Sequence, residues 1–558
     1  MQLHRFLKVV SISFFLCLNT VVLIGQNTFT NGVGNSDWHT AGNWSGGVPT
    51  ATDIVVIPNG LTANISMDAV ARTIRLAGGT LNMTAGTLTI DEGDVGLDGI
   101  FFDGGGILSV SAGAVVIIRN TFFAGIFVDN SSGNTATINN SGTITIGPSI
   151  GLVGIDVNNN NNSLKITNSG TIGISSTFDD GIVVRNNSSV ALLNNGTFTI
   201  GTNIGRDGIR VRGGDLQITN TKTLTFGPDL PNGDGIYVIN GGSINLTNQA
   251  GGLLTTSANP NIGFSFITVE NNPDVASLIS NFGQVTVNMD NTGDDFLNLF
   301  GGNVSVVNQA GGVMTVSNIS DDAFNFDGNT AQGGAILSNF GTINVTNVMD
   351  EAFDISTPGS ATNQAAGVIM VNGVVNEDAF NVTGTFTNDG RISIAGVQTQ
   401  AGIDVEVTGP NSGSFINNNL INITMGNTSN PAIEVDALAS LTNTTCAIIN
   451  ILTQSPIVNN GIFTNDGVLT SFFTGTNTNS GTFNNAGRLS TPTGAFLLSP
   501  NGLTGSNTII TSSPIPATVC LPPVDPDPIP TLSQWGLLIF GLLLLNLGVF
   551  FILRMEGV

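Results

Sequence analysis

Histidine is almost absent from this chain, which has only His4 and His39 among its 558 residues. His4 lies in an N-terminal segment that we expect to be removed. A His-dependent catalytic triad or a multi-His metal site would therefore rest on His39 alone. The shortage of histidine argues against both kinds of site.

Basic residues are also scarce. Lys and Arg together number 14 against 38 Asp and Glu, which leaves a formal net charge of −24. Such an excess of carboxylates repels phosphate backbones, so we expect no nucleic-acid partner. Charged residues make up only 9% of the chain and apolar residues 41%, unlike the weakly hydrophobic, highly charged composition of disordered chains. The chain is therefore expected to fold.

Cysteine is limited to Cys17, Cys446 and Cys520, and Cys17 lies in the segment that we expect to be removed. Cys446 and Cys520 could form a disulfide in an oxidising compartment, but one bond cannot be the framework of so long a chain. Cys446 stands in the apolar run Thr-Thr-Cys-Ala-Ile-Ile with no histidine near it in sequence. This setting favours a structural cysteine over a nucleophile.

Residues 1–25 have the composition of a secretory signal peptide. Arg5 and Lys8 supply the positive flank, and an apolar stretch runs from Val9 to Ile24. We expect cleavage near Gly25 or Gln26. The sequence therefore predicts export.

Two short phrases recur through residues 64–515. The first joins an Asn-initiated turn to an alternating strand and begins at Asn140, Asn168, Asn194, Asn281, Asn339 and Asn388. The second joins an acidic residue to a small residue and an apolar run, and begins at Asp180, Asp207, Asp234, Asp322, Glu351 and Asp378. Copies lie 26 residues apart from Asn168 to Asn194 and 27 apart from Asp180 to Asp207. This period, without helical periodicity, predicts an all-β fold, a single-stranded parallel β-helix or β-solenoid.

Stacking of such coils predicts columns of equivalent side chains. We expect one interior column of Ile182, Ile209 and Ile236, continued by Phe324, Phe353 and Phe380. Small residues precede that column, as a tight corner would require: Gly181, Gly208, Gly235, Ala323, Ala352 and Ala379. Asn side chains at equivalent corners are expected to hydrogen-bond along the axis.

Residues 26–63 differ from the repeats and predict an N-terminal cap. The run Asn43-Trp-Ser-Gly-Gly-Val-Pro resembles the openings of bacterial β-helical surface proteins. That resemblance, with the general preference for right-handed crossovers, implies a right-handed coil. We expect Trp38 and Trp44 to cover the open end of the first coil, where strand edges and apolar surface would be exposed. Stacking of these rings on a sugar is the alternative.

An acidic residue recurs once in many of the coils and forms a predicted column. Carboxylates one strand spacing apart, about 4.8 Å, repel one another, so something must compensate. In one interpretation each caps its own turn by accepting backbone N–H bonds and stays in solvent. In the other, the column and the corner Asn carbonyls bind Ca²⁺, which prefers oxygen ligands. The column contains Glu351 and the candidate calcium ligands Asp180, Asp207, Asp234, Asp295, Asp322 and Asp378.

A polysaccharide lyase or glycoside hydrolase on a β-helix is the alternative function. The doublets Asp179-Asp180, Asp294-Asp295 and Asp321-Asp322 are similar to the paired carboxylates of glycan hydrolases. However, the doublets recur with the repeat, whereas a catalytic site should interrupt it, and no Gly-His-Gly or Arg-Ile-Lys companion is present. A local group of Arg206, Arg210 and Arg212 leaves a lyase-like use of arginine open. We expect no enzyme activity and assign no catalytic residue.

The C-terminus combines a spacer with an apolar run. Residues 516–530 are rich in proline and predict an extended linker. The following segment, 529–558, contains the apolar stretch 535–553, which is long enough for a transmembrane helix and ends before Arg554. The motif before this stretch consists of Ile529, Pro530, Thr531, Leu532, Ser533, Gln534, Trp535 and Gly536.

This motif, apolar stretch and terminal arginine resemble the IPTL-CTERM sorting domain of Gram-negative bacteria. The resemblance implies recognition by an exosortase-type enzyme, cleavage near the motif, and transfer to the cell surface or extracellular matrix. Arg554 stands alone with Glu556 nearby, whereas the family usually ends in several basic residues. A plain membrane anchor without processing is the alternative. We therefore expect an exported surface protein with a structural or adhesive role, in contact with the membrane and with extracellular polysaccharide or other cells.

Overall fold

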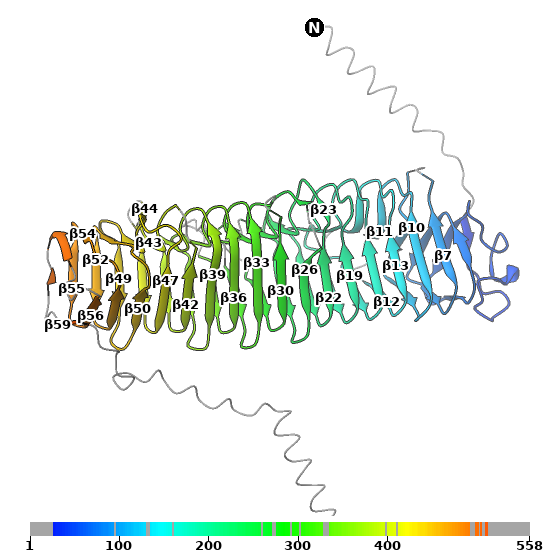
Figure 1. The fold of residues 1–558 in the computed structure, drawn as a ribbon. Helices are drawn as coiled ribbons and strands as arrows, with labels where there is room; N and C mark the ends of the chain where they lie inside the picture. The colour runs from blue at the N-terminus through cyan, green and yellow to red at the C-terminus, as the bar shows by residue number, and fades with distance from the viewer. Residues whose placement is uncertain are drawn as a thin grey trace, which may run out of the picture. The chain divides into compact units, whose positions relative to one another are not determined.

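The computed structural model describes residues 26–511 apart from 94–95, 130–133, 159–160, 258–260, 271–274, 291–292, 301–302, 327–333, 397–398, 409–410, 492–496, 502 and 505–507. The described chain is an all-β parallel β-solenoid, in which successive coils stack side by side along one axis (Figure 1). The predicted parallel β-helix is thus confirmed. No helix among the described residues has the length and apolar character needed to cross a bilayer. The predicted signal peptide 1–25, linker 516–530 and sorting segment 529–558, with its transmembrane helix 535–553, lie outside these residues.

Three long parallel sheets run along the solenoid, and a typical coil adds one strand to each. The first sheet contains β1 (Gln26–Thr28), β2 (Ile54–Pro58), β5 (Thr73–Ala77), β8 (Ile100–Asp103), β11 (Ala124–Asp129), β14 (Val153–Val157), β17 (Ile182–Arg185), β20 (Ile209–Arg212), β24 (Ile236–Ile239), β28 (Ile267–Glu270), β31 (Leu297–Phe300), β34 (Phe324–Phe326), β37 (Phe353–Ile355), β40 (Asn381–Val382), β43 (Ile403–Val405), β48 (Ile433–Val435), β51 (Ile457–Asn459), β54 (Thr476–Asn479) and β57 (Leu497–Pro500). The acidic column lies at the turn that leads into this sheet.

The second sheet follows within each coil. It contains β3 (Thr62–Ile65), β6 (Thr80–Met83), β9 (Gly106–Val110), β12 (Thr135–Asn140), β15 (Ser163–Asn168), β18 (Ser189–Asn194), β21 (Asp215–Asn220), β25 (Ser243–Asn248), β29 (Ser277–Asn281), β32 (Val304–Asn308), β35 (Ile336–Asn339), β38 (Ser360–Asn363), β41 (Thr385–Asn388), β46 (Ser414–Asn417), β49 (Ser440–Asn443), β52 (Ile462–Asn465), β55 (Thr482–Asn485) and β58 (Leu503–Thr504).

The third sheet completes the coil. It contains β4 (Ala69–Ala71), β7 (Thr87–Asp91), β10 (Val115–Arg119), β13 (Thr143–Ile146), β16 (Thr171–Ile174), β19 (Thr197–Ile200), β22 (Thr223–Phe226), β26 (Leu253–Thr256), β30 (Gln284–Asn288), β33 (Val313–Ile319), β36 (Thr342–Val348), β39 (Val368–Val375), β42 (Arg391–Ala395), β47 (Leu420–Thr424), β50 (Ile448–Ile451), β53 (Val468–Ser471), β56 (Arg488–Thr491) and β59 (Thr508–Thr511). The remaining elements are the short pairs β23 (Asp229–Leu230) with β27 (Asn261–Ile262) and β44 (Val407–Thr408) with β45 (Asn411–Ser412), and the 3₁₀ turn η1 (Ala41–Asn43).

The strands form because apolar residues alternate with polar ones and the apolar set points into the coil. In β13, for example, Ile144 and Ile146 are buried between the partly exposed Thr143 and Thr145. Equivalent residues of successive coils are in register, as in the pairing of Ile144 with Ile172. A slip of one residue would turn every isoleucine outward, so the pattern fixes the register.

The expected interior columns are present. Ile182 pairs with Ile209 and Ile209 with Ile236, and the column continues to the stacked rings of Phe324, Phe353 and Phe380. Adjacent ring centroids in that stack are 4.7 and 4.8 Å apart. The small-residue column is only partly as predicted, because the bulkier Phe266 and Phe296 stand between Gly235 and Ala323. Where glycine occurs, the corner is tight: a Cβ on Gly208 would lie 2.6 Å from the carbonyl oxygen of Gly235.

Asparagine forms the predicted ladder along the axis. From Asn140 to Asn485 the side-chain Nδ2 of each Asn donates to the side-chain Oδ1 of the Asn in the next coil at 2.6–2.9 Å. The ladder consists of Asn140, Asn168, Asn194, Asn220, Asn248, Asn281, Asn308, Asn339, Asn363, Asn388, Asn417, Asn443, Asn465 and Asn485. All are buried, so each bond satisfies groups that water does not reach.

The two N-terminal tryptophans are buried in the core. Their ring centroids lie 4.7 Å apart, and the Trp44 Nε1 donates to the Trp38 carbonyl oxygen at 2.6 Å. Trp38 is fully buried and Trp44 almost so. This placement supports the covering role and is incompatible with sugar stacking, which needs an open ring face. Strand β2 and the first two residues of β3 lie in the segment 26–63 predicted as a cap, and these strands already pair with β5 and β6 of the next coil.

Candidate functional site

The acidic column lies at the corner that leads into the first sheet. Its aspartates are at most 6% exposed, so the expectation that these carboxylates stay in solvent is wrong. Each one accepts a hydrogen bond from the backbone N–H of the equivalent residue in the next coil. Asp180 Oδ1 accepts from Asp207 N at 3.1 Å, and Asp207 Oδ1 accepts from Asp234 N at 3.0 Å. The carboxylates therefore cap the following coil.

The same arrangement continues towards the C-terminus. Asp234 accepts from Ser265 N at 2.8 Å, and Asp295 accepts from Asp322 N at 3.0 Å. Asp322 in turn accepts from Glu351 N at 3.0 Å. Asp378 accepts from Ala401 N at 2.5 Å. The carboxylates thus accept backbone N–H bonds, as one interpretation predicted. The donors belong to the neighbouring coil, whereas the prediction placed them in the same turn.

Burial raises the pKa of every aspartate in the column. Desolvation is the largest cause throughout. The pKa rises to about 7 for Asp180 and Asp234, and to about 8 for Asp207, Asp295 and Asp378. The pKa of Asp322 rises further, to about 11, because Glu351 adds a second carboxylate beside it. A charged column is therefore costly unless cations neutralise it.

Arginines neutralise part of this face in the N-terminal half. Arg185 forms two bonds with Asp156, at 3.1 and 2.6 Å. Arg206 Nη1 lies 3.0 Å from Asp179 Oδ1, and Arg210 Nη1 lies 3.4 Å from Asp207 Oδ2. Two of the three singled-out arginines thus meet carboxylates of the corner. The third, Arg212, is exposed at the end of β20.

A pocket of about 370 Å³ lies beside Arg210. Its lining includes Arg210, Asp207, Tyr237, Glu270 and Asp234. Arg210 lies over the Tyr237 ring at 5.2 Å from its centroid, and the Tyr237 hydroxyl donates to Glu270 Oε2 at 2.8 Å. Arg210 Nη1 and Asp207 Oδ2 are buried without a hydrogen-bond partner. They form an ion pair with each other in the pocket wall, without a hydrogen bond between them.

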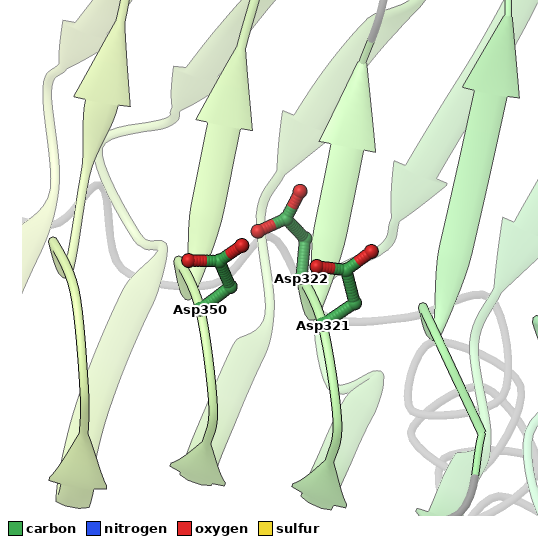
Figure 2. A group of neighbouring side chains, drawn as sticks. All are labelled: Asp321, Asp322 and Asp350. Carbon is green, nitrogen blue, oxygen red and sulfur yellow. The ribbon is translucent and has the colours of Figure 1, made fainter.

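Carboxylates gather closely enough for a metal ion further along the corner. Figure 2 shows Asp321 and Asp322 in one coil and Asp350 in the next, and one oxygen from each lies within 4.8 Å of the others. A second such group, among the residues that could be searched, consists of Asp350, Glu351 and Glu377. Hard oxygen ligands of this kind suit Ca²⁺.

Of the six predicted calcium ligands, Asp322 is the one that belongs to such a group within the described chain. The other five, Asp180, Asp207, Asp234, Asp295 and Asp378, are not brought together with two further ligands there. The prediction missed Asp321, Asp350 and Glu377. The sequence does contain a pattern that could have identified them, because each lies directly before a residue of the acidic column. Three successive coils carry the doublets Asp321-Asp322, Asp350-Glu351 and Glu377-Asp378.

Cys446 is disulfide-bonded, which agrees with the predicted disulfide and not with a free nucleophile. Its partner lies outside the described residues, and the pairing with Cys520 stays a prediction. The residue adopts a positive φ of 76° in the turn before β50.

The comparison with protein families gives one finding at the C-terminus. Residues 527–554 match the IPTL-CTERM motif. The IPTL-CTERM motif is a C-terminal sorting signal, and it points to an exported, surface-associated protein, as the sequence predicted. The predicted motif residues Ile529 to Gly536 and the terminal Arg554 fall inside the match. No curated protein matches the chain. The assignment of the β-solenoid body therefore depends on its structure alone.

Proposed function

We propose that this protein is an adhesive structural rod displayed on the cell surface of a Gram-negative bacterium. An exosortase-type enzyme sorts it through the IPTL-CTERM motif, after a right-handed body has been exported and the C-terminal helix 535–553 has held the chain in the membrane. The observation that carries the proposal is the pairing of a sorting motif with a long β-solenoid.

The body suits a load-bearing role. Backbone ladders run through all three sheets, and the buried Asn ladder runs beside them. Each coil contacts its neighbours, so stability grows with the number of stacked repeats. A rod of this kind keeps a binding surface away from the membrane without an additional domain.

The pocket beside Arg210 favours adhesion through sugars. Arg210 Nη1 and Asp207 Oδ2 form an ion pair at 3.4 Å without a hydrogen bond between them, so a sugar hydroxyl that reaches them can donate to the carboxylate and accept from the guanidinium. The volume of about 370 Å³ is at the lower end of the range for small-molecule sites. We therefore infer that extracellular polysaccharide is the partner, and that the pocket holds one sugar unit.

Glycan-array binding tests this role. The exported protein should bind a subset of polysaccharides, and Arg210→Ala should reduce that binding by about tenfold or more, the loss of one charged hydrogen bond. Arg391→Ala, an exposed arginine of β42, is the matched control and should bind normally. Silence of the wild-type protein on the array would overturn adhesion and leave a passive scaffold.

The proposal includes no reaction. Incubation of the protein with acidic polysaccharides should release no unsaturated or reducing ends. Cleavage that disappears in Arg210→Ala would instead establish the lyase alternative.

Sorting has a separate test. Replacing Pro530 and Trp535 by alanine should leave export intact but prevent attachment, so that the protein accumulates unprocessed in the membrane. Fractionation of cells and analysis of the C-terminal peptide by mass spectrometry measure this. Normal surface attachment of the double variant would contradict exosortase-type sorting.

A further inference from the structure

The acidic corner is interrupted in two neighbouring coils of the N-terminal half. Equivalent positions of four successive coils hold Asp98, Ala124, Val153 and Asp180. The residues directly before Ala124 and Val153 are Phe123 and Leu152, where the next coil has the doublet Asp179-Asp180. The backbone does not change at the interruption, because Ala124 N donates to Asp98 Oδ1 at 2.9 Å just as Asp207 N donates to Asp180. Apolar side chains thus replace the acids while the coil keeps its shape.

A pocket of about 410 Å³ lies over this interruption. Its lining includes Phe123 and Leu152, which are 43% and 41% exposed, and Phe127 of β11. The volume falls in the usual range for small-molecule sites. Apolar side chains that remain exposed around a cavity mark a surface that another molecule can cover.

The pocket contains the end of an aromatic stack. The Phe127 ring stacks on that of Phe101, with centroids 5.5 Å apart and an interplanar angle of 21°. The Arg75 guanidinium lies over Phe101, 5.7 Å from its centroid, at the other end of the stack. The stack stops at Phe127 because the next coil has Asp156 in register. The face of an aromatic ring carries partial negative charge, so the ring that lines the pocket can attract a cation as Phe101 attracts Arg75.

The charged residues of the lining add to this attraction. Asp98, Asp156 and Asp179 line the pocket with a single guanidinium, that of Arg185. Arg185 forms an ion pair with Asp156, and Asp179 forms one with Arg206. Asp98 has no such partner in the described part of the chain. Burial, with the neighbouring Asp156 carboxylate, raises the pKa of Asp98 to about 6, so Asp98 is still mostly ionised at neutral pH.

We propose that this pocket binds an organic ammonium group carried on an apolar chain. The Asp98 carboxylate pairs with the ammonium group, the face of Phe127 provides the second contact with it, and the apolar chain lies against Phe123 and Leu152. A metal ion suits the pocket less well, because these three apolar residues supply no oxygen ligand. A neutral sugar also suits it less well, because its hydroxyl groups would lose water against apolar side chains. The inference does not depend on adhesion through sugars, since the pocket beside Arg210 has a different lining.

Calorimetric titration of the exported protein with three small probes tests the site. Hexyltrimethylammonium, hexylammonium and hexan-1-ol have the same apolar chain and differ in the head group. Both ammonium probes should bind at least about tenfold more tightly than the alcohol, because only they can pair with a carboxylate. The tighter of the two identifies the natural head group as quaternary or primary. Equal affinity for all three probes, tighter binding of the alcohol, or no binding of either ammonium probe would overturn the proposal.

Two variants assign the contacts. Asp98→Asn keeps an oxygen for the Ala124 N–H and removes the charge, so it should weaken both ammonium probes about tenfold and leave the alcohol unchanged. Phe127→Leu keeps an apolar side chain and removes the ring, so it should weaken the ammonium probes about threefold.

Matched controls exclude general effects of charge and of surface aromatic residues. Asp466→Asn removes an exposed acid and Phe472→Leu an exposed ring elsewhere on the body, and both should bind as wild type does. Thermal melts of each variant show that it is folded, and Phe127→Leu alone decides if Asp98→Asn does not fold. A wild-type preference for ammonium over alcohol in the folded variants would contradict the assignment of this pocket.

Discussion

The N-terminal and C-terminal halves of the acidic face differ in the arginines that lie beside their carboxylates. Coils from Asp156 to Asp234 meet their carboxylates with Arg185, Arg206 and Arg210. From Thr223 to Gly390 the sequence contains no lysine or arginine, although Asp and Glu recur in almost every coil. The backbone stacking is the same in both halves. The difference teaches that the fold accommodates a buried acidic corner both with and without arginines beside it.

The largest expected effect is a dependence of stability on pH when metal is chelated. Asp295, Asp378 and Asp404 have a folded-state pKa of about 8 against an ordinary value of 3.8. The folded chain therefore holds more protons than the unfolded chain between these values, and the free energy of unfolding falls as pH rises from about 4 to 8. Each tenfold difference in proton affinity between the folded and unfolded chain corresponds to about 1.4 kcal/mol. Several such groups should therefore lower the free energy of unfolding by several kcal/mol.

Thermal melts followed by circular dichroism at pH 5 and pH 8 measure this dependence. In chelator the melting temperature should be lower at pH 8, and calcium should restore much of the difference. A higher melting temperature at pH 8 in chelator would show that the carboxylates are not strained by burial.

The Asn ladder should cost the same in both halves, because it is continuous across them. Asn220→Ala and Asn388→Ala each leave buried neighbours without a partner, and each should lower the free energy of unfolding by about 1–3 kcal/mol. Denaturant unfolding measures both. Very unequal losses would mean that the two halves differ in more than their charges.

Removing an arginine should make the N-terminal half behave like the C-terminal one. Arg185→Ala leaves Asp156 with neither of its charged bonds, and we expect a loss of about 1–2 kcal/mol because the pair is partly exposed. Burial raises the pKa of Asp156, so the loss should be smaller at pH 5 than at pH 8. An equal loss at both pH values would indicate that Arg185 acts only through packing.

Adding an arginine should do the reverse, with the smallest effect. Arg210 follows Asp207 by three residues in its coil. Asn381 follows Asp378 by three residues and so occupies the equivalent position. Asn381→Arg places a cation three residues after Asp378 and in register with Asp404. We expect a gain in the free energy of unfolding of less than about 1 kcal/mol, measured by denaturant unfolding. Asn325→Arg makes the same change three residues after Asp322 and should give a similarly small gain.

Much of the fold could be predicted because its signals are local and repeated. The alternation in phrases such as that from Asn140 to Ile146 specifies strands, and the interval between copies specifies the coil. The stacked column from Ile182 to Phe380 and the Asn ladder followed directly. The small corner residues were predicted less well, since Phe266 and Phe296 occupy that position in two coils.

The candidate site could be predicted only in part. The recurrence of Asp180, Asp207 and Asp234 located the acidic corner, but burial of these side chains was not evident from a turn-like sequence. The distinction between a carboxylate paired with arginine and one facing only other acids depends on which side chains meet across coils. Asp404 and Glu434, 30 residues apart in sequence, become neighbours only through strand pairing.

The sequence by itself determined the repeat, the parallel solenoid and the sorting motif, because each depends on a short pattern of residues that are close in sequence. The tertiary structure alone decided where the acids lie relative to water and to one another. Stacking removes the corner from solvent and brings successive coils within one strand spacing, so it turns isolated aspartates into a buried, interacting column. The raised pKa values of these aspartates are a consequence of this burial and proximity.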